Sequence, residues 1–287
     1  MNFVDTHCHI QSVGRNIGER GTRGLWSKAP DLNIQTILQN AQDAGVTKLV
    51  CVGCDVEDSQ LAVDFAQSHD TCWASIGIHP HEAKHYAGKD ADLSKFADLA
   101  DQPKVIAVGE CGLDYYYGHS SPADQEKVLR FQIELAQKHD LPIIFHVREA
   151  FEDFWRIFDD YKDIRGVLHS FTDTGTNMQK AIQKGLYIGV NGMVTFAKDP
   201  AQIAMYKSIP INRLLLETDA PFLTPSPHRG RINQPKHIKY IAEFLTELRD
   251  DDMETLAAAT SRNAQELFGG LEWANRIYTS ITQPQHL

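Results

Sequence analysis

The sequence predicts an α/β fold, a single (β/α)8 TIM barrel, from the order and composition of its apolar segments. Eight short apolar runs recur along the chain, and longer amphipathic stretches separate them, which is the pattern of repeated βαβ units. The runs are almost continuously apolar, as in residues 104–108, and such strands are typical of a parallel sheet covered on both faces. Eight units in roughly 250 residues match the usual size of a closed barrel.

The apolar runs and the amphipathic stretches give the expected elements in order. Strands are expected at residues 3–9, 48–54, 73–79, 105–111, 142–147, 166–171, 186–190 and 213–218. Helices are expected at residues 33–44, 58–69, 93–100, 123–138, 150–160, 176–184, 201–207, 235–248 and 252–268. Residues 1–270 are therefore expected to form the barrel domain, and residues 271–287 a C-terminal extension.

A doubly wound open sheet is the alternative fold. It would need a glycine-rich phosphate-binding turn directly after the first strand. The sequence His-Ile-Gln-Ser-Val-Gly stands there instead, which favours the barrel.

The composition is that of a globular protein that does not enter a membrane. The chain is 42% hydrophobic and 23% charged, and no apolar run reaches the roughly 18 residues of a membrane span. The first residues lack the basic and apolar regions of a secretory signal, so we expect a cytoplasmic location. The net charge of −10 argues against binding a polyanion over the whole surface, but it leaves room for a local basic patch.

The five cysteines are scattered and odd in number, which does not indicate a disulfide framework. Cys51 and Cys54 form a Cys-x-x-Cys pair at the end of an expected strand. Strand alternation would turn their sulfurs to opposite faces, so we expect packed, reduced thiols rather than a redox or zinc site.

Side chains that can bind metals stand at the ends of nearly all the expected strands. His7 and His9 are two residues apart, so a strand would place both on one face and Cys8 on the other. The later strand ends carry His79, His81, Glu110, His146, His169, Glu217 and Asp219. Because the C-terminal ends of parallel barrel strands meet at one rim, we expect these side chains to converge there.

This set of donors predicts a binuclear metal site at the C-terminal strand ends. Four histidines, one glutamate and one aspartate can hold two divalent ions, with Glu110 as the bridge because a carboxylate has two oxygens. Mixed imidazole and carboxylate donors suit zinc, manganese or iron, and magnesium more weakly. Two such ions can activate water and stabilise a phosphoryl or carbonyl oxygen.

The strand-end motifs appear together in one known family. They are Asp5-Thr-His7-Cys-His9, Gly77-Ile-His79-Pro-His81, Gly109-Glu110-Cys-Gly-Leu-Asp114-Tyr, Pro142-Ile-Ile-Phe-His146-Val-Arg148, Leu168-His169-Ser170-Phe171, Leu216-Glu217-Thr218-Asp219-Ala-Pro221, Pro227-His228-Arg229-Gly230 and Asn233-Gln-Pro235, followed by Asn263-Ala and Leu267-Phe268. In these motifs, and in their order over residues 1–270, the chain resembles the TatD family of metal-dependent hydrolases and deoxyribonucleases, which are amidohydrolase-like TIM barrels.

The resemblance implies the roles of the strand-end residues. The implied metal ligands are His7, His9, Glu110, His146, His169 and Asp219. The implied reaction is hydrolysis of phosphodiester bonds in DNA, with Asp219 also taking the proton of the attacking water. Glu217 shares a face with Asp219 if the strand alternates, and would then orient a ligand; the alternative is that it faces solvent in the mouth.

Two other functions remain open. The same ligands would serve hydrolysis of an ester or amide, for example an aminoacyl ester on RNA. A metal-holding binding protein without turnover is the second alternative, although a structural metal site is usually closed and four-coordinate. The metal, the physiological substrate and the oligomeric state are not determined by the sequence.

Five further residues are candidate substrate contacts: His79, His81, Arg148, His228 and Arg229. The alternative for His79 is packing beneath the site, and the alternative for Arg148 is a salt bridge to a neighbouring acid. Residues 115–117 are three tyrosines that would either stack on a base or form a packed aromatic cluster.

Residues 12–30 depart from the family, which usually has a short stretch here. The segment contains Arg15, Arg20, Arg23 and Lys28 together with Trp26. One hypothesis is that it lies over the metal site and offers cations and an aromatic ring to a nucleic acid or another anion. A surface loop or a subunit contact is the alternative.

Overall fold

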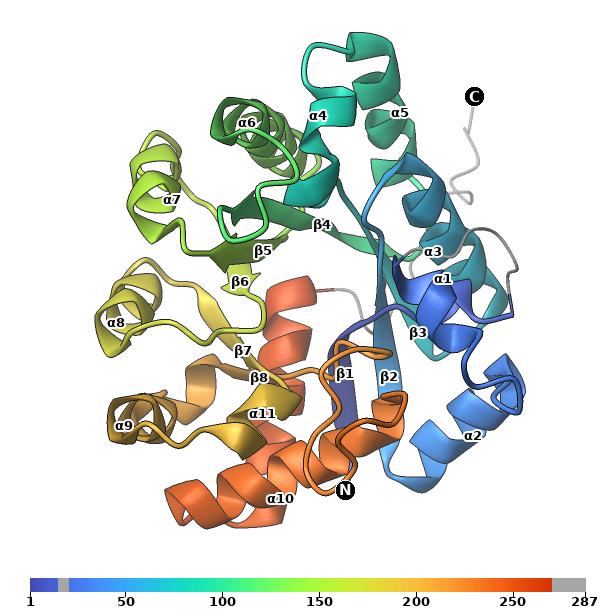
Figure 1. Ribbon diagram of the computed structural model, residues 1–287, viewed down its shortest axis with the longest axis vertical. Helices are drawn as coiled ribbons and strands as arrows, with labels where there is room; N and C mark the ends of the chain where they lie inside the picture. The colour runs from blue at the N-terminus through green and yellow to red at the C-terminus, as the bar shows by residue number, and fades with distance from the viewer. Residues whose placement is uncertain (15–20, 270–287) are drawn as a thin grey trace, which may run out of the picture.

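The computed structural model describes residues 1–14 and 21–269. Its eight strands form one sheet in the order β1 to β8, ringed by helices (Figure 1). All neighbouring strands are parallel. The strands are β1 (Phe3–Cys8), β2 (Val46–Val52), β3 (Cys72–Ile76), β4 (Val105–Asp114), β5 (Ile143–Arg148), β6 (Gly166–Leu168), β7 (Tyr187–Val190) and β8 (Leu214–Leu216). The predicted (β/α)8 barrel is confirmed.

The first and last strands meet and nearly close the barrel. Cys8 forms a parallel bridge with Ala220, just beyond β8. The Asp219 amide donates a hydrogen bond to the His7 carbonyl over 2.8 Å, and the Thr6 hydroxyl donates to the Leu216 carbonyl over 3.0 Å. The contacts that close the barrel therefore lie beside His7 and Asp219, two of the expected ligands.

Helices follow the strands in the expected alternation. They are α1 (Gly21–Trp26), α2 (Ile34–Asp43), α3 (Val56–Ser68), α4 (Ala83–Tyr86), α5 (Asp90–Ala100), α6 (Pro122–Lys138), α7 (Phe151–Phe158), α8 (Gly175–Gln183), α9 (Pro200–Ser208), α10 (Ile238–Arg249) and α11 (Met253–Phe268). Side-chain caps begin several of them: Asp55, for example, accepts a hydrogen bond from the Asp58 amide at the start of α3. No helix among the described residues is long and apolar enough to cross a membrane.

The buried apolar residues form two clusters. The larger one lies between the strands and the surrounding helices. The smaller one takes side chains from all eight strands, which places it inside the barrel, and adds Ala264, Leu267 and Phe268 of α11. Helix α11 therefore covers the N-terminal end of the barrel, opposite the expected metal site.

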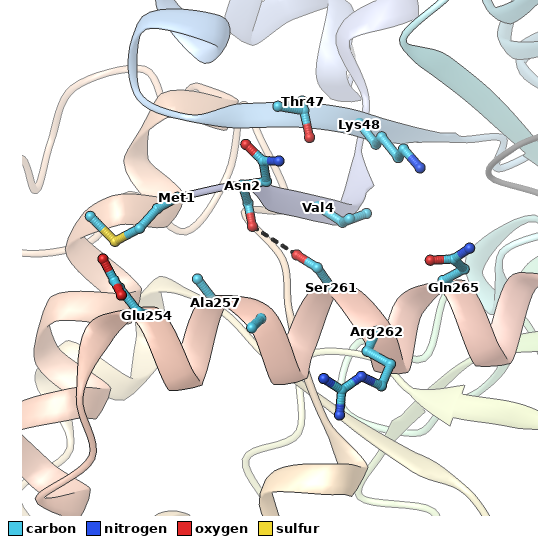
Figure 2. Close-up of a pocket in the computed structure, with 11 residues that line it drawn as sticks. Met1, Asn2, Val4, Thr47, Lys48, Glu254, Ala257, Ser261, Arg262 and Gln265 are labelled. Atoms are coloured by element: carbon cyan, nitrogen blue, oxygen red, sulfur yellow. Dashed lines mark hydrogen bonds between the residues drawn. The ribbon is translucent and has the colours of Figure 1, made fainter.

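Helix α11 is tied to this end by polar contacts as well. The Asn263 side chain donates hydrogen bonds to the Ile211 and Leu214 carbonyls, and Ser261 donates to the Asn2 carbonyl over 2.8 Å. Figure 2 shows the Ser261 bond beside a cavity of about 520 Å³ between α11 and the beginnings of β1 and β2.

Strand lengths differ from the prediction at the functional end. Strand β4 continues to Asp114, whereas β6 ends at Leu168 and β8 at Leu216. Ser170 has a left-handed backbone angle (φ 50°), which ends the extended conformation before the predicted limit at residue 171. Asp219, directly after the predicted limit at residue 218, is left-handed as well (φ 58°). The predicted C-terminal extension, residues 271–287, lies outside the described residues.

Candidate metal centre

His7 and His9 lie at the C-terminal end of β1 with their rings turned toward each other. Their Nε2 atoms are 3.2 Å apart, and both side chains are buried. His9 Nδ1 lies 2.9 Å from the Val52 carbonyl and donates to it in the tautomer that leaves Nε2 free to bind a metal. Cys8 points the other way and donates to the Val50 carbonyl, as strand alternation predicts.

Glu110 on β4 lies between two groups of histidines. Its Oε2 atom is 3.3 Å from His7 Nε2. Its Oε1 atom is 2.7 Å from His146 Nδ1 and 3.8 Å from His169 Nε2. Burial alone would raise the pKa of this carboxyl, but the surrounding histidines outweigh it and hold the pKa well below its ordinary value. The two oxygens of Glu110 thus face different sets of donors.

His146 and His169 are each oriented by a second carboxylate. Asp114 Oδ2 lies 3.0 Å from His146 Nε2, so His146 faces Glu110 through Nδ1. Glu217 Oε1 lies 2.9 Å from His169 Nδ1 and accepts a hydrogen bond from the Ser170 amide over 2.6 Å. Carboxylates in these positions fix the ring orientation of a metal-binding histidine.

Glu217 is only 1% exposed, so the alternative in which it faces solvent in the mouth is wrong. The expected strand alternation is not what positions Glu217 and Asp219, because β8 ends before both of them. Gly189 on β7 makes room for Glu217, since a Cβ atom there would lie 2.5 Å from Glu217 Oε2.

Asp219 turns toward the β1 histidines through its left-handed backbone. Its Oδ1 atom lies 3.3 Å from His9 Nε2 and 3.6 Å from His7 Nε2. Burial would raise the pKa of Asp219, but the hydrogen bond from His9 and the charges of His169 and His7 bring it below its ordinary value. At 13% side-chain exposure Asp219 is more open to solvent than Glu110, at 5%.

A second buried aspartate supports this corner of the site. Asp5 accepts hydrogen bonds from the amide and the hydroxyl of Thr218, and burial raises the pKa of Asp5 to about 7. These bonds join the start of β1 to the residue before Asp219. Asp5 belongs to the motif Asp5-Thr-His7-Cys-His9, and the sequence alone predicted no role for it.

The donor atoms fit divalent metal ions. Three groups in this region each bring three donor atoms within 4.8 Å of one another: His7, His169 and Asp219; His7, His9 and Glu110; and His79, Glu110 and His146. Imidazole nitrogens this close to one another and to carboxylates suit Zn²⁺, Mn²⁺ or Fe²⁺. All six residues of the expected ligand set belong to these groups, and His79 joins them.

His79 and His81 follow β3 on the same side. His79 Nε2 lies 3.6 Å from Glu110 Oε1, and burial lowers the pKa of His79 to about 3. His81 Nε2 lies 3.1 Å from Asp114 Oδ2 and is more exposed. Asp114 therefore contacts both His81 and His146, a role that was not predicted. The spacing of Asp114 from Glu110 could have indicated this role, because residues 110, 112 and 114 share one face of a strand.

The two candidate arginines both lie over aromatic rings. The Arg148 guanidinium is 4.0 Å from the ring centroid of Tyr116, and that of Arg229 is 5.1 Å from the centroid of Phe196. Among the described residues Arg148 forms no ion pair, so the predicted alternative of a salt bridge is wrong within this part of the chain. Both arginine side chains are exposed.

His228 is placed by packing. Its ring stacks on His237 at a centroid distance of 4.9 Å and contacts Tyr240 edge-on. Its Nε2 atom is buried and has no hydrogen-bond partner among the residues described. Its predicted role in substrate binding stays a prediction.

The hypothesis for residues 12–30 is wrong in one respect. Trp26 is 4% exposed, packs in the larger core cluster and donates a hydrogen bond to the His9 carbonyl, so its ring is not offered to a substrate. It supports the backbone of His9 instead. Arg15 and Arg20 and the side chain of Arg23 lie outside the described residues.

All five cysteines are free thiols, as expected. Cys51 is buried in the core, whereas Cys54 lies at the edge of the metal centre with Sγ 4.0 Å from His9 Nδ1. His9, Cys54 and Asp58 form a further group of side chains that could bind a metal. Because His9 Nδ1 is already within hydrogen-bond distance of Val52, we assign this group to support of His9.

The chain matches a known family over almost the whole described region. The family model described as TatD related DNase matches residues 4–269. The chain is 35% identical over 270 residues to the uncharacterized metal-dependent hydrolase YabD of Bacillus subtilis, covering 93% of this chain and 98% of that protein. It is 36% identical over 262 residues to the 3'-5' ssDNA/RNA exonuclease TatD of Escherichia coli, covering 88% and 98%.

Solved structures agree with this match. The crystal structure of YjjV, a TatD homolog from Escherichia coli, superposes with a TM-score of 0.81 at 27% identity over 93% of this chain and 98% of that chain. A TatD family hydrolase from Entamoeba histolytica has the same fold, with a TM-score of 0.79 at 22% identity over 93% and 98%. The chain therefore belongs to the TatD-related DNase family of metal-dependent hydrolases, as its motifs predicted.

Proposed function

We propose that this protein is a nuclease that hydrolyses phosphodiester bonds in DNA, using two divalent metal ions. One observation carries the proposal: the two oxygens of Glu110 face separate groups of histidines, at 3.3 Å and 2.7 Å. A carboxylate in that position can bridge two cations and offset their charge. The relatives named as nucleases support the phosphodiester as the bond that is cleaved.

Six residues would hold the ions: His7, His9 and Asp219 on one side, His146 and His169 on the other, and Glu110 between them. Divalent ions bound there would polarise a phosphoryl oxygen and lower the pKa of a water molecule. Asp114 and Glu217 keep the rings of His146 and His169 in place. These donors accept several divalent metals.

In this proposal Asp219 takes the proton of the attacking water. Its carboxylate is more exposed than that of Glu110, and its Oδ1 atom lies 3.3 Å from His9 Nε2 and 3.6 Å from His7 Nε2, beside the groups that would hold the metal. Glu217 is too deeply buried to reach a substrate, so its contribution to catalysis is to orient His169.

Cationic side chains at the rim would bind the phosphates of the substrate. Arg148 presents an exposed guanidinium group at the end of β5, and Arg229 presents one in the loop that follows β8. His81 is the more exposed of the β3 histidines and can donate to a phosphate oxygen. These groups form a local basic rim on an acidic protein. The free cysteines agree with a cytoplasmic location, which we include in the proposal.

The test begins with metal analysis of the purified protein. Rates are then compared on single-stranded DNA, duplex DNA and a model carboxylic ester in the metal found. Turnover of DNA but not of the ester supports the proposal. Turnover of the ester alone would favour the alternative hydrolase, and bound metal without turnover of either would favour a binding protein.

Two variants then test the roles of the carboxylates. Glu110→Gln and Asp219→Asn should each lower kcat on the order of 10³-fold or more, because each removes charge from the reacting centre. Glu152→Gln, an exposed carboxylate on α7, is the matched control and should retain wild-type kcat. Full activity in either of the first two variants, with folding confirmed by circular dichroism, would contradict the mechanism.

A further inference from the structure

Two adjacent tyrosines stand out on the surface of the described residues. Large hydrophobic side chains there are rarely more than a third exposed, yet Tyr116 is 54% and Tyr117 is 52% exposed. Tyr115 differs from both, because it packs against the core and donates a hydrogen bond to Asp153 over 2.9 Å. Tyr115 therefore fits the predicted alternative of a packed aromatic ring. Tyr116 and Tyr117 are exposed to solvent, as the alternative of stacking on a base requires.

The two open rings are held in a fixed arrangement. They meet edge to face at 4.8 Å, and the Arg148 guanidinium lies 4.0 Å from the centroid of Tyr116 and 4.9 Å from that of Tyr117. His119 stacks against Tyr117 at 5.7 Å after a left-handed turn at Gly118. A cation on a ring face holds both groups in place and leaves the remaining ring surface exposed to solvent.

A single carboxylate connects these rings to the metal centre. Asp114 Oδ1 accepts hydrogen bonds from the amides of Tyr116 and Tyr117, over 3.0 Å and 3.2 Å. Asp114 Oδ2 lies 3.0 Å from His146 Nε2. The His81 ring centroid lies 5.3 Å from that of Tyr117 and 4.3 Å from that of His79, and His79 contacts Glu110, so two side chains separate Tyr117 from Glu110.

We propose that Tyr116 and Tyr117, backed by Arg148, form a stacking platform for an unpaired nucleobase beside the phosphodiester that is cleaved. The platform, by which we mean these three residues, rests on the proposed nuclease function. It assigns to this chain's own residues the contact with an unpaired base in a single strand, the kind of substrate for which the nuclease relatives are named. The proposal is based on the position of the two exposed tyrosine rings and the Arg148 guanidinium beside the candidate metal centre.

Chemistry favours an unpaired base as the occupant. A nucleobase offers a flat π-face to a tyrosine, and its neighbouring phosphate offers a charge to Arg148. A base inside a duplex already stacks on its neighbours and has no free face. Stacking accepts every base, so the platform would select strandedness rather than sequence. Each stacked base is worth roughly 1–3 kcal/mol, which is about a 5- to 150-fold change in affinity.

The experiment compares two strands of equal length and charge. One is an eight-residue thymidine strand, and the other an abasic strand of eight residues; both carry phosphorothioate linkages that resist hydrolysis. Affinity is measured by fluorescence anisotropy with the metal-loaded protein. Tyr116→Ala combined with Tyr117→Ala should weaken binding of the thymidine strand at least 5-fold and leave binding of the abasic strand unchanged.

Two matched variants control for the fold and for general loss of aromatic surface. Replacing both tyrosines by phenylalanine keeps the rings and should keep wild-type affinity. Tyr161→Ala removes a tyrosine that also lies beneath an arginine, Arg130, but follows α7 at the other end of the barrel. It should change neither affinity.

The outcomes separate the platform from the nuclease function. Equal weakening for both strands, or no weakening for either, would overturn the platform, whether or not the wild-type protein cleaves DNA. Base-dependent binding that the alanine variants abolish would support the platform. If the wild-type protein binds in this way but hydrolyses no phosphodiester in any metal, the proposed nuclease function fails and the platform remains.

Discussion

At the scale of single residues, Asp114 connects the metal centre to the loop that carries Tyr116 and Tyr117. One oxygen contacts His146 and His81, and the other accepts two backbone amides from the tyrosine loop. The histidines and these hydrogen bonds hold the pKa of Asp114 below its ordinary value, although burial opposes the shift. Asp114 is therefore an ionised positioning residue.

We expect Asp114→Asn to lower metal affinity 10- to 100-fold, because His146 loses the charged partner that fixes its ring. Titration calorimetry with the native metal measures this change, and kcat should largely recover at saturating metal. Asp101→Asn is the matched control: Asp101 also contacts a histidine, His139 at 2.9 Å, but on the surface of the protein. Unchanged affinity in Asp114→Asn would show that His146 is held by other contacts.

A second residue, His237, makes stability depend on pH. Its Nδ1 donates to Asn233, and burial, followed by repulsion from His228, lowers the pKa of His237 from 6.5 to about 4. The unfolded chain therefore takes up the proton first as pH falls. The stabilising contribution is complete above pH 6.5 and is lost between pH 6.5 and 4, by up to about 3 kcal/mol.

We expect His237→Gln to reduce this acid sensitivity, since glutamine keeps the donor to Asn233 but does not titrate. Urea unfolding at pH 7 and pH 4.5 should show a smaller loss of free energy of unfolding in the variant than in wild type. His85→Gln removes an exposed histidine and should behave as wild type. The idea is wrong if all three proteins lose the same free energy.

Residue identities at strand ends were predictable because imidazoles and carboxylates are rare in apolar strands. His7, His146 and Glu110 could be selected on that basis alone. Asp114 could not be assigned, because its function depends on which histidine faces it across β4 and β5. Trp26 was misjudged for the same reason: an aromatic residue in a charged segment gives no sign that its ring packs in the core.

At the scale of elements, the strands were predictable and their ends were not. Apolar composition marks where a chain is buried, and each of the eight expected runs overlaps a strand. The ends of β6 and β8 depend on tertiary hydrogen bonds, from the Ser170 amide to Glu217 and from the Asp219 amide to His7. Such bonds permit the left-handed backbone at Ser170 and Asp219, and local sequence does not reveal them.

Strand β4 gives an element-scale prediction through Gly112. Its φ is 151°, and a Cβ atom there would lie 1.8 Å from the His146 carbonyl oxygen, where β4 pairs with β5. Gly112→Ala should therefore push apart the two strands that carry Glu110 and His146. We expect a loss of about 3 kcal/mol or more in the free energy of unfolding, with a loss of metal binding in the folded protein.

Gly185→Ala is the control for backbone strain alone. Gly185 also has a left-handed φ, 84°, but no atom lies within 4 Å of the Cβ position. It should cost about 1 kcal/mol and leave metal binding intact. Chemical unfolding and metal titration of both variants measure the difference, and equal costs would argue against crowding at Gly112.

At the scale of the whole molecule, the barrel separates chemistry from support. The metal-competent groups lie at the C-terminal ends of the strands, and α11 covers the opposite end with Ala264, Leu267 and Phe268. The barrel interior between them is filled by apolar side chains from every strand. Because this apolar layer separates the groups at the two ends, we expect a change at the α11 end to act on stability rather than on the metal ligands.

This separation predicts opposite effects for changes at the two ends. Phe268→Ala empties a buried position, 4% exposed, and should cost about 3–5 kcal/mol of stability. Well below the lowered melting temperature, its kcat and metal affinity should equal those of wild type. Glu110→Gln should abolish turnover and lose the stabilisation that bound metal gives, which is about 2.7 kcal/mol at 100 times the Kd.

Thermal unfolding of both variants and wild type with and without chelator, together with kcat measured at one common temperature about 20 °C below the lowest Tm, tests the separation. In Phe268→Ala the chelator should lower the Tm as it does in wild type, because the metal centre is intact. In Glu110→Gln the chelator should have little effect, because little metal is bound. A parallel loss of kcat and stability in Phe268→Ala would mean that α11 positions the metal ligands through the barrel interior, and the two ends would then have to be treated as one cooperative unit.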